Sequence, residues 1–361
     1  TSNSEYYKWT QSFFLLMFNH YYCNDEKKSR PIKDLVKIFE IQGNIKVKAF
    51  SDNKVKLFNS SKWNSFSFRE KQNILINYRI AYLAEKEVNW CPKLGTVLAN
   101  DEIINGVSER GGYTVVKKKM KQWSLRITAY AERLLKDLDL IDWPDALKEM
   151  QRNWIGKSKG ARVFFKIKDY DDKIDVYTTR PDTIFGATFL TLAPELDIVK
   201  KITSKQNKNE VLEYIDSTSK KSQLDRMSEV RKITGVFTGA YAIHPFTNEF
   251  LPIWIGDYVL ADYGSGAVMG VPCGDQRDYD FAKKFKISIV NIFKNVSIEN
   301  EAFTDKSRTI ITNSSFLNNL SFEMAFKTVI KELEKNDSGL EEVNYKLRDA
   351  VFSRQRYWGE P

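Results

Sequence analysis

Strand-like and helical segments alternate between residues 153 and 345, and this alternation constrains the fold more than any other feature of the sequence. The runs Val163–Ile167 and Ile174–Tyr177 are rich in β-branched and aromatic residues, which predicts strands. Further strands are expected at 251–260, 267–271 and 287–292, and helices at 195–203, 210–217 and 321–336. Because alternating strands and helices bury the faces of one sheet, this stretch is expected to form a compact α/β module.

The remaining parts of the chain give weaker signals. Residues 6–22 and 70–85 are expected to be helical, whereas short alternating runs within 44–67 indicate exposed strands. Turn dipeptides separate short strands over 91–122, and apolar residues recur at helical spacing over 125–138. A chain of 361 residues is longer than one core usually spans, so two or three domains are expected.

Composition excludes some classes of protein and leaves others open. The sequence contains no apolar run of the roughly 18 residues that a membrane span needs, and no secretory or transit signal is visible. Its three widely spaced cysteines argue against a disulfide framework and for a reducing compartment. A net charge of +9 attracts polyanions such as nucleic acid, but a lysine-rich surface explains the excess equally well.

Polar side chains are concentrated where one predicted strand ends. Thr178, Thr179 and Thr183 lie in the segment Tyr177–Gly186, together with Arg180 and an aspartate at 182. Hydroxyls at a strand end can hydrogen-bond a polar ester and shape the wall of a pocket. They make no strong nucleophile without a histidine or lysine partner. The alternative is a strand-to-turn junction that is simply rich in capping residues.

A glycine-rich segment runs from Tyr263 to Asp278. It lacks the Gly-Lys-Ser/Thr ending of a phosphate loop, and its glycines precede a strand instead of following one, which excludes a dinucleotide-binding loop. We expect a short buried strand and then a helix that begins near Asp275, whose side chain caps it. Asp278 lies in the first turn, where it either supports the helix or pairs with a substrate ammonium group.

Arginines and aromatic residues are mixed near the end of the sequence. Arg348, Arg354 and Arg356 lie within a segment that also contains Phe352, Tyr357 and Trp358. Such a mixture suits contacts to RNA phosphates and bases. Taken alone the signal is weak, because arginine-rich runs are often simply solvated.

In this order, the three segments resemble leucyl-tRNA synthetases. The resemblance covers nearly the whole chain and is strongest in the motifs Thr-Thr-Arg-Pro-Asp-Thr and Asp-Gln-Arg-Asp. Isoleucyl and valyl synthetases share the architecture, but these motifs are closer to those of the leucyl type. The other similar segments are Glu5–Thr10, Asn89–Pro92, Thr96–Asn100, Gln122–Trp123, Ile127–Ala131, Met150–Gly156 and Asn344–Asp349.

The resemblance implies an α/β fold in which part of a class I Rossmann-type catalytic core is interrupted by a compact, β-barrel-like editing domain. It also implies that the chain is an internal fragment of a bacterial-type enzyme. The implied divisions are 1–90 (catalytic core, with a lineage-specific insertion near 25–70), 91–122 (a degenerate zinc-module-like region), 123–152 (return of the core), 153–345 (the editing domain, connective polypeptide 1) and 346–361 (a return strand).

The resemblance also implies roles for individual residues. Asp278 would bind the α-ammonium of an aminoacyl-tRNA, and Thr183 would act as a steric gate that rejects leucine. Thr178 and Thr179 would hydrogen-bond the ester, the terminal ribose or the attacking water. Val268, Met269, Arg180, Asp182 and Asp275 would complete the editing pocket, and Arg348, Arg354 and Arg356 would bind tRNA. Editing is needed because a pocket separates side chains that differ by one methylene by only about 1–3 kcal/mol.

Two departures from the family pattern matter. Family members usually have a histidine where this chain has Gly274, which weakens the case for an imidazole in the reaction. Many relatives also carry a cysteine-rich zinc module after Asn-Trp-Cys-Pro, but the segment Val107–Gly112 has no cysteine or histidine. Cys91 alone cannot form a four-ligand site, so no metal is expected.

The expected activity is therefore the hydrolytic half of a leucine–tRNA ligase. The His-x-Gly-His and Lys-Met-Ser-Lys-Ser motifs of aminoacylation are missing, and His20 and His244 lie far apart, with His244 expected in a loop. No cofactor is expected for these residues, whereas the parent enzyme would use ATP and Mg. The expected partner is tRNA(Leu), including its misacylated form, with no DNA and no membrane. A cytoplasmic monomer is expected. The alternatives are a valyl or isoleucyl editing fragment, or a tRNA-binding module that has lost editing.

Overall fold

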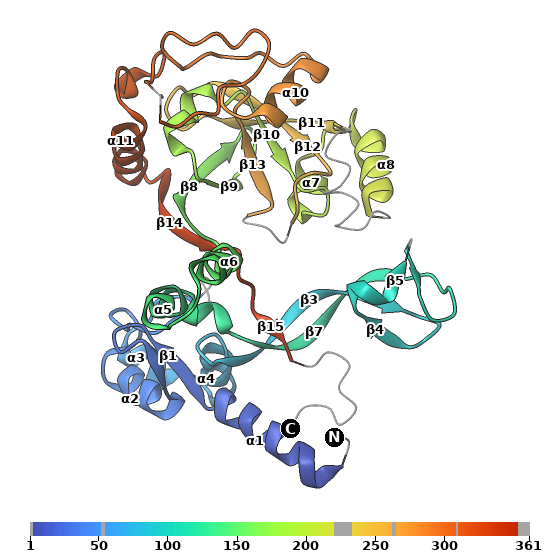
Figure 1. Ribbon diagram of the computed structural model, residues 1–361, viewed down its shortest axis with the longest axis vertical. Coiled ribbons are helices and arrows are strands. Elements are labelled where there is room, and N and C mark those ends of the chain that lie inside the picture. The colour runs from blue at the N-terminus through green and yellow to red at the C-terminus, as the bar shows by residue number, and fades with distance from the viewer. Residues whose placement is uncertain are drawn as a thin grey trace. The chain divides into compact units, whose positions relative to one another are not determined.

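The computed structural model describes residues 3–51, 55–104, 106–219, 233–261, 265–307 and 310–352. The chain forms two compact units, one of residues 158–344 and the other of residues 1–157 and 345–361 (Figure 1). Among the described residues, no helix has the length and apolar composition that crossing a membrane requires.

The unit that contains the N-terminus is built on a long antiparallel pair of strands. Its elements are α1 (Ser4–Phe18), β1 (His20–Cys23), β2 (Lys28–Pro31), α2 (Ile32–Gln42), α3 (Ser60–Ser65), α4 (Phe68–Leu75), β3 (Ala81–Cys91), β4 (Thr96–Leu98), η1 (Asn100–Glu102), β5 (Ile103–Ile104), β6 (Val107–Ser108), β7 (Val116–Leu125), η2 (Ile127–Tyr130), α5 (Ala131–Asp137), η3 (Leu138–Leu140), α6 (Asp145–Ile155) and β15 (Ala350–Val351). Strands pair in the order β15-β7-β3-β4. Gly156, with φ 60°, ends α6 in the left-handed conformation that glycine adopts without steric cost.

Three expectations for this unit were wrong. The helix expected over 6–22 ends at Phe18, and His20–Cys23 form β1 instead. The helix expected over 70–85 ends at Leu75, because the following residues join a sheet in which Ala81 pairs with Leu125. The strands expected within 44–67 are absent from the described residues of that stretch. Instead the side-chain amide of Asn44 bonds Lys56 O and Tyr78 Oη, each at 3.1 Å, and ties the segment to an aromatic core. That core includes Phe39, Phe58, Trp63 and Tyr78.

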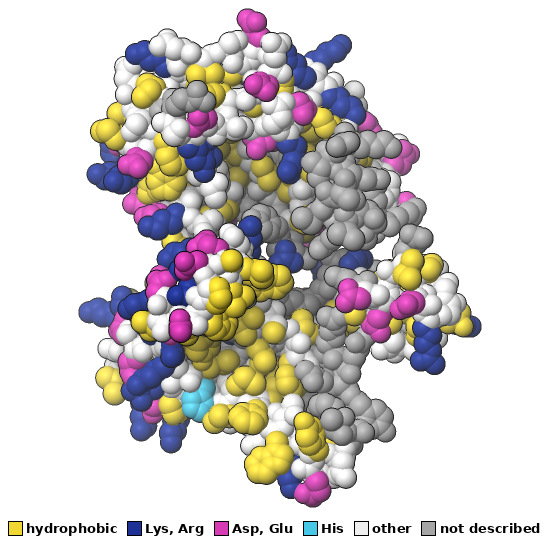
Figure 2. All heavy atoms as spheres, in the orientation of Figure 1, with side chains coloured by type: hydrophobic (Ala, Val, Ile, Leu, Met, Phe, Trp, Pro, Cys, Tyr) yellow, Lys and Arg dark blue, Asp and Glu magenta, His cyan; other side chains and the backbone are white. Residues whose placement is uncertain are grey.

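One face of α1 is apolar and exposed. Tyr6, Trp9, Phe13 and Leu16 are between 54% and 65% accessible, and their spacing places them along one side of the helix. Hydrophobic side chains gather over this helix in the space-filling view (Figure 2). Phe14, on the opposite side, is buried against Trp123 and Phe352.

The second unit is a curved sheet with helices around it. Its elements are β8 (Lys157–Ile167), β9 (Lys173–Thr178), η4 (Pro181–Gly186), β10 (Phe189–Leu192), α7 (Asp197–Ile202), α8 (Lys208–Ser219), β11 (Val236–Ile243), β12 (Phe250–Ile255), β13 (Ala267–Gly270), α10 (Gln276–Phe285), η5 (Ser315–Leu317), α11 (Phe322–Lys335) and β14 (Gly339–Tyr345). In the described residues the strand order is β13-β10-β12-β11-β8-β14, with β9 also paired to β8. Only β10 and β12 pair in parallel among the adjacent strands whose registers are defined.

The sheet closes on itself. Strand β13 lies at one end of the hydrogen-bonded path, yet it contacts β9, which branches from β8 near the other end. This closure gives the barrel-like α/β form that the sequence resemblance implied. It brings the end of β9 close to the end of β13, and these are the two segments that carry the candidate site residues.

Most secondary structure expected for this unit is present. Helices α7, α8 and α11 and strands β8, β9 and β13 lie where they were expected. The strand expected at 251–260 ends at Ile255, where a turn begins and the backbone N–H of Asp257 donates to Tyr214 Oη. The expectation of a strand at 287–292 was wrong, because that segment is irregular in the structure. Its apolar residues serve burial without strand pairing, since Ile292 is fully buried.

Candidate functional site

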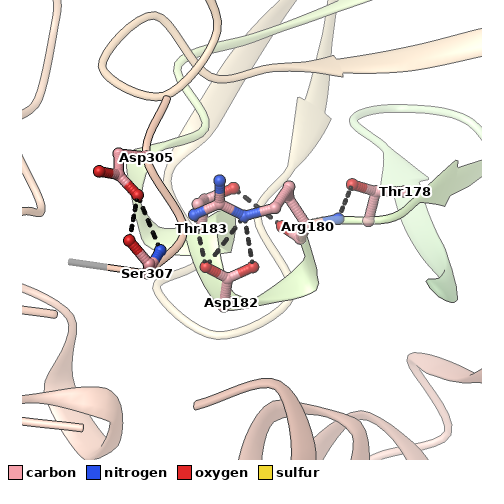
Figure 3. A network of polar contacts seen from close by, with 6 residues as sticks. All are labelled: Thr178, Arg180, Asp182, Thr183, Asp305 and Ser307. Atoms are coloured by element: carbon pink, nitrogen blue, oxygen red, sulfur yellow. Dashed lines mark hydrogen bonds and ion pairs between the residues drawn. The ribbon is translucent and has the colours of Figure 1, made fainter. Parts of the chain in front are cut away.

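The first part of the site is a tight turn around Arg180 (Figure 3). The hydroxyl oxygen of Thr178, at the end of β9, accepts a hydrogen bond from the Arg180 N–H at 3.0 Å. Thr183, in η4, donates from both its backbone N–H and its hydroxyl to Arg180 O, at 3.1 and 2.8 Å. Thr183 is buried, with 2% of its surface accessible, whereas Thr179 is exposed. The hydroxyl proton of Thr183 is therefore engaged inside the turn.

An ion pair stabilises the same turn. The guanidinium of Arg180 binds the Asp182 carboxylate through Nε at 3.0 Å and Nη2 at 2.9 Å. Asp182 is fully buried, and desolvation raises the pKa of its carboxyl while the adjacent guanidinium opposes that rise. The carboxylate is directed at Arg180, as Figure 3 shows. Any contribution of Asp182 to a pocket would therefore act through Arg180.

The second part of the site follows β13 and begins α10. The expected cap is confirmed, because Asp275 Oδ1 accepts hydrogen bonds from the N–H groups of Arg277 at 2.9 Å and Asp278 at 3.2 Å. Asp278 is only 5% accessible, and its Oδ2 accepts from the Val271 N–H at 2.8 Å. Desolvation, with a smaller contribution from the negative charge of Asp275, raises the pKa of Asp278 to about 8.

Cys273 and Gly186 join the two parts. An ideal Cβ on Gly186 would lie 2.8 Å from Cys273 Sγ, so only a hydrogen atom fits between η4 and the β13–α10 connection. Cys273 is fully buried, and desolvation raises the pKa of its thiol to about 12. The charges of both Arg180 and Asp278 also act on this thiol, so it lies near the ion pair and near the buried carboxyl group.

The two apolar residues expected to line one pocket point to opposite faces of the sheet. Val268 pairs with Thr191 and Met269 with Leu190 in adjacent positions of one strand, and adjacent side chains alternate. Met269 is buried in the main core, whereas Val268 is half-buried. Val271, which the sequence analysis did not single out, follows the strand and is buried in the same core cluster as Met269. Its N–H binds Asp278 directly.

His244 was expected in a loop, and it does follow β11 directly, but it is 1% accessible. Its Nε2 lies 3.0 Å from Ile184 O in η4, so it touches the segment that carries Thr183. No periodicity or spacing in the sequence links residue 244 to residue 184. The one available signal was the scarcity of histidine, since the chain has two.

The remaining predicted residues lie in the other unit or outside the described residues. Arg348 is exposed, and Arg354 and Arg356 are outside the residues that the structure describes. In the region compared with a zinc module, Ser108 Oγ accepts from the Tyr113 N–H at 2.9 Å. Across the described ranges, no group of three or more His, Cys, Asp or Glu side chains could hold a metal ion. The expected lack of zinc stays a prediction for metal analysis.

Comparison with known proteins gives a consistent result. Residues 152–334 match the family model described as "Leucyl-tRNA synthetase, editing domain", which is 183 of the 361 residues. The chain is 59% identical over 361 residues to a leucine–tRNA ligase from Christiangramia forsetii and 57% identical over 366 residues to one from Flavobacterium johnsoniae. All of this chain is covered in both cases, but it spans 38% of the length of each relative.

A solved structure is similar as well. A LeuRS from Agrobacterium radiobacter, crystallised in a ternary complex with tRNA and LeuAMS, matches with a TM-score of 0.59 and 34% sequence identity. The match covers 78% of this chain and 32% of that one. The valyl and isoleucyl alternatives are not favoured by these matches. The chain therefore belongs to the leucyl-tRNA synthetase family and carries that family's editing domain.

Proposed function

We propose that the unit of residues 158–344 hydrolyses the ester bond of mischarged tRNA(Leu). The observation that carries this proposal is the buried carboxylate of Asp278, which lies in one site with the Thr183 turn through the Gly186–Cys273 contact. A partly desolvated carboxylate is a strong partner for the α-ammonium of an aminoacyl group. An approaching ammonium lowers the raised pKa of Asp278 and so favours the anionic form of its carboxyl group.

Thr183 is suited to a steric role. Because its hydroxyl donates to Arg180 O, that proton is not available to a substrate, and the buried side chain acts through its shape. The branched end of leucine would meet this side chain, whereas a straight chain such as norvaline would pass. A difference of one branch in such a pocket is worth about 1–3 kcal/mol, or 10–200-fold in rate.

The hydroxyl group of Thr178 can donate a hydrogen bond to a substrate. Its oxygen accepts the Arg180 N–H, so its own O–H remains able to donate to the ester, the ribose or a water. Thr179 is exposed beside it. Hydrolysis requires a water oriented beside a carbonyl that hydrogen bonds polarise, and positioning of this kind lowers the barrier without a nucleophilic side chain. In this proposal the threonine side chains orient the ester and the water, and the water attacks the ester carbonyl.

A protein that contains this chain and has its relatives' full length would be a leucine–tRNA ligase, which is the name of those relatives. We propose in addition that such a protein uses ATP and Mg. The complex of the Agrobacterium LeuRS with tRNA supports tRNA as the partner. We extend the proposal to a monomer that acts in the cytoplasm.

Hydrolysis of norvalyl-, isoleucyl- and methionyl-tRNA(Leu) by the chain tests the proposal. We expect the wild type to cleave at least one of these esters and Asp278→Ala to lose about 100-fold or more of that rate, as for removal of a charge-paired group. Asp280→Asn is the matched control, because it removes an exposed carboxylate from the same helix. If the wild type binds tRNA without cleaving any ester, the chain is a tRNA-binding module instead.

A further inference from the structure

The imidazole ring of His244 makes three hydrogen bonds, all to backbone groups. Nδ1 accepts from the N–H groups of Phe246 at 3.2 Å and Thr247 at 3.1 Å, within the turn between β11 and β12. Nε2 lies 3.0 Å from the carbonyl oxygen of Ile184, 60 residues away in sequence. The imidazole therefore links the β11–β12 hairpin of the sheet to η4.

These contacts fix the chemical state of the ring. Because Nδ1 accepts two hydrogen bonds, it carries no proton, and Nε2 must then carry the proton and donate it to Ile184 O. Burial lowers the pKa of His244, which keeps the ring neutral. The carboxylate that acts on it is that of Glu249, and the rings of Phe185 and Phe246 cover it.

The carbonyl group that His244 binds belongs to Ile184, the residue after Thr183. Thr183 itself donates two hydrogen bonds to Arg180 O, three residues earlier. These two bonds shape the turn, but they do not connect it to the rest of the unit. His244 connects that turn to the sheet. The next residue, Phe185, stacks on Phe246 with ring centroids 5.6 Å apart, and Phe246 belongs to the same hairpin.

We propose that His244 is a positioning residue that holds the Thr183 side chain in place and thereby sets the discrimination between leucine and smaller or unbranched side chains. The inference rests on the proposed hydrolytic function and concerns its specificity. Displacing a group by about 1 Å can cost on the order of 100-fold where geometry decides the reaction. A loosened Thr183 turn admits leucine, so the expected effect is a gain of leucyl-tRNA hydrolysis, which general destabilisation would not produce.

Two substitutions separate the acceptor role of Nδ1 from the donor role of Nε2. In His244→Asn the side-chain oxygen can still accept from the N–H groups two and three residues later, as in an Asx turn, but the donor to Ile184 is lost. In His244→Gln the amide N–H reaches the position of Nε2 and can donate to Ile184 O, while the acceptor for the turn is lost. The readout is the ratio of leucyl-tRNA(Leu) to norvalyl-tRNA(Leu) hydrolysis, with Thr183→Ala as the reference for an open gate.

We expect His244→Asn to raise this ratio about tenfold or more and His244→Gln to keep it near the wild-type value. Equal ratios in His244→Asn and the wild type, or a rise in His244→Gln as large as in His244→Asn, would overturn the proposal. So would failure of His244→Asn to fold, since the link to Ile184 would then be required for folding of the unit and would not act on specificity alone. A wild type that cleaves none of the norvalyl, isoleucyl and methionyl esters instead defeats the proposed function.

The tautomer of His244 provides a test that needs no activity. The imidazole ¹⁵N shifts of the wild-type chain distinguish Nε2–H from Nδ1–H, and His20→Gln assigns the signals because the chain has only two histidines. We expect a neutral Nε2–H ring at neutral pH. A ring protonated on Nδ1 would overturn the link to Ile184 even if hydrolysis is observed.

Discussion

The Asp278 carboxylate accepts a hydrogen bond from the Val271 N–H, with Oδ2 and N 2.8 Å apart, in a place where the side chain is almost fully buried. One N–H group does not replace the water that a carboxylate loses on burial, so the pKa of Asp278 is raised to about 8. The free site thus holds a carboxyl group whose charged form is only partly compensated. A substrate ammonium completes the pairing, which couples binding to the charge state of this residue.

Asp278→Asn should stabilise the fold while abolishing hydrolysis. The amide keeps an oxygen for the Val271 N–H but carries no charge. A raised folded-state pKa means that the unfolded carboxyl ionises first, so wild-type stability falls as pH rises from about 4 to about 8. We expect the variant to gain roughly 1–3 kcal/mol of unfolding free energy at pH 8. Urea unfolding at pH 5 should show a much smaller gain, because the wild-type carboxyl is then largely protonated. A variant less stable than the wild type at pH 8 would contradict this account.

Thr183→Ala should start to hydrolyse correctly charged leucyl-tRNA. Removing the buried branched side chain opens the space that the branched end of leucine needs. We expect a rise of about 10–200-fold in the initial rate of leucyl-tRNA(Leu) hydrolysis. Thr183→Val is the matched control, because it keeps the shape and loses only the hydroxyl that donates to Arg180 O. If the valine variant admits leucine as readily as the alanine variant, the hydroxyl and not the shape decides rejection.

Arg180→Ala should destabilise the editing unit. Asp182 is fully buried, and loss of the guanidinium leaves its charge uncompensated, at a cost of about 3–5 kcal/mol in the free energy of unfolding. The double variant Arg180→Met/Asp182→Leu should recover most of this loss, since it removes both charges and keeps apolar volume. Denaturant unfolding of both variants measures the difference. A double variant as unstable as Arg180→Ala would show that the ion pair is not the cause.

Gly186→Ala and Gly274→Ala should differ sharply although they lie on either side of Cys273. At Gly186 a Cβ would lie 2.8 Å from Cys273 Sγ, and overpacking of this kind costs about 1–3 kcal/mol. At Gly274 the nearest atom to a Cβ is Phe293 Cζ at 3.4 Å, an ordinary contact, so we expect a change of about 0.5 kcal/mol or less. Thermal unfolding compares the two. Gly274→His should fold too, and its hydrolysis rate measures what an imidazole at this position contributes.

The sequence by itself determined the family, the α/β class and most local elements of the editing unit. The Thr178–Gly186 and Gly264–Asp278 segments are each continuous in the sequence, so the identity and spacing of their residues can be recognised without a structure. The cap by Asp275 was predictable for the same reason, because capping joins residues two and three positions apart.

Tertiary structure alone decided how these segments combine. Closure of the sheet brings β13 to β9, and burial within that closure raises the pKa of Asp278 and fills the space at Gly186 with the Cys273 thiol. The tertiary structure also links His244 to Ile184 and, in the other unit, draws residues 81–85, expected to be helical, into β3. Each of these depends on contacts between residues far apart in the chain, whose free energies exceed the local preferences that a sequence pattern records.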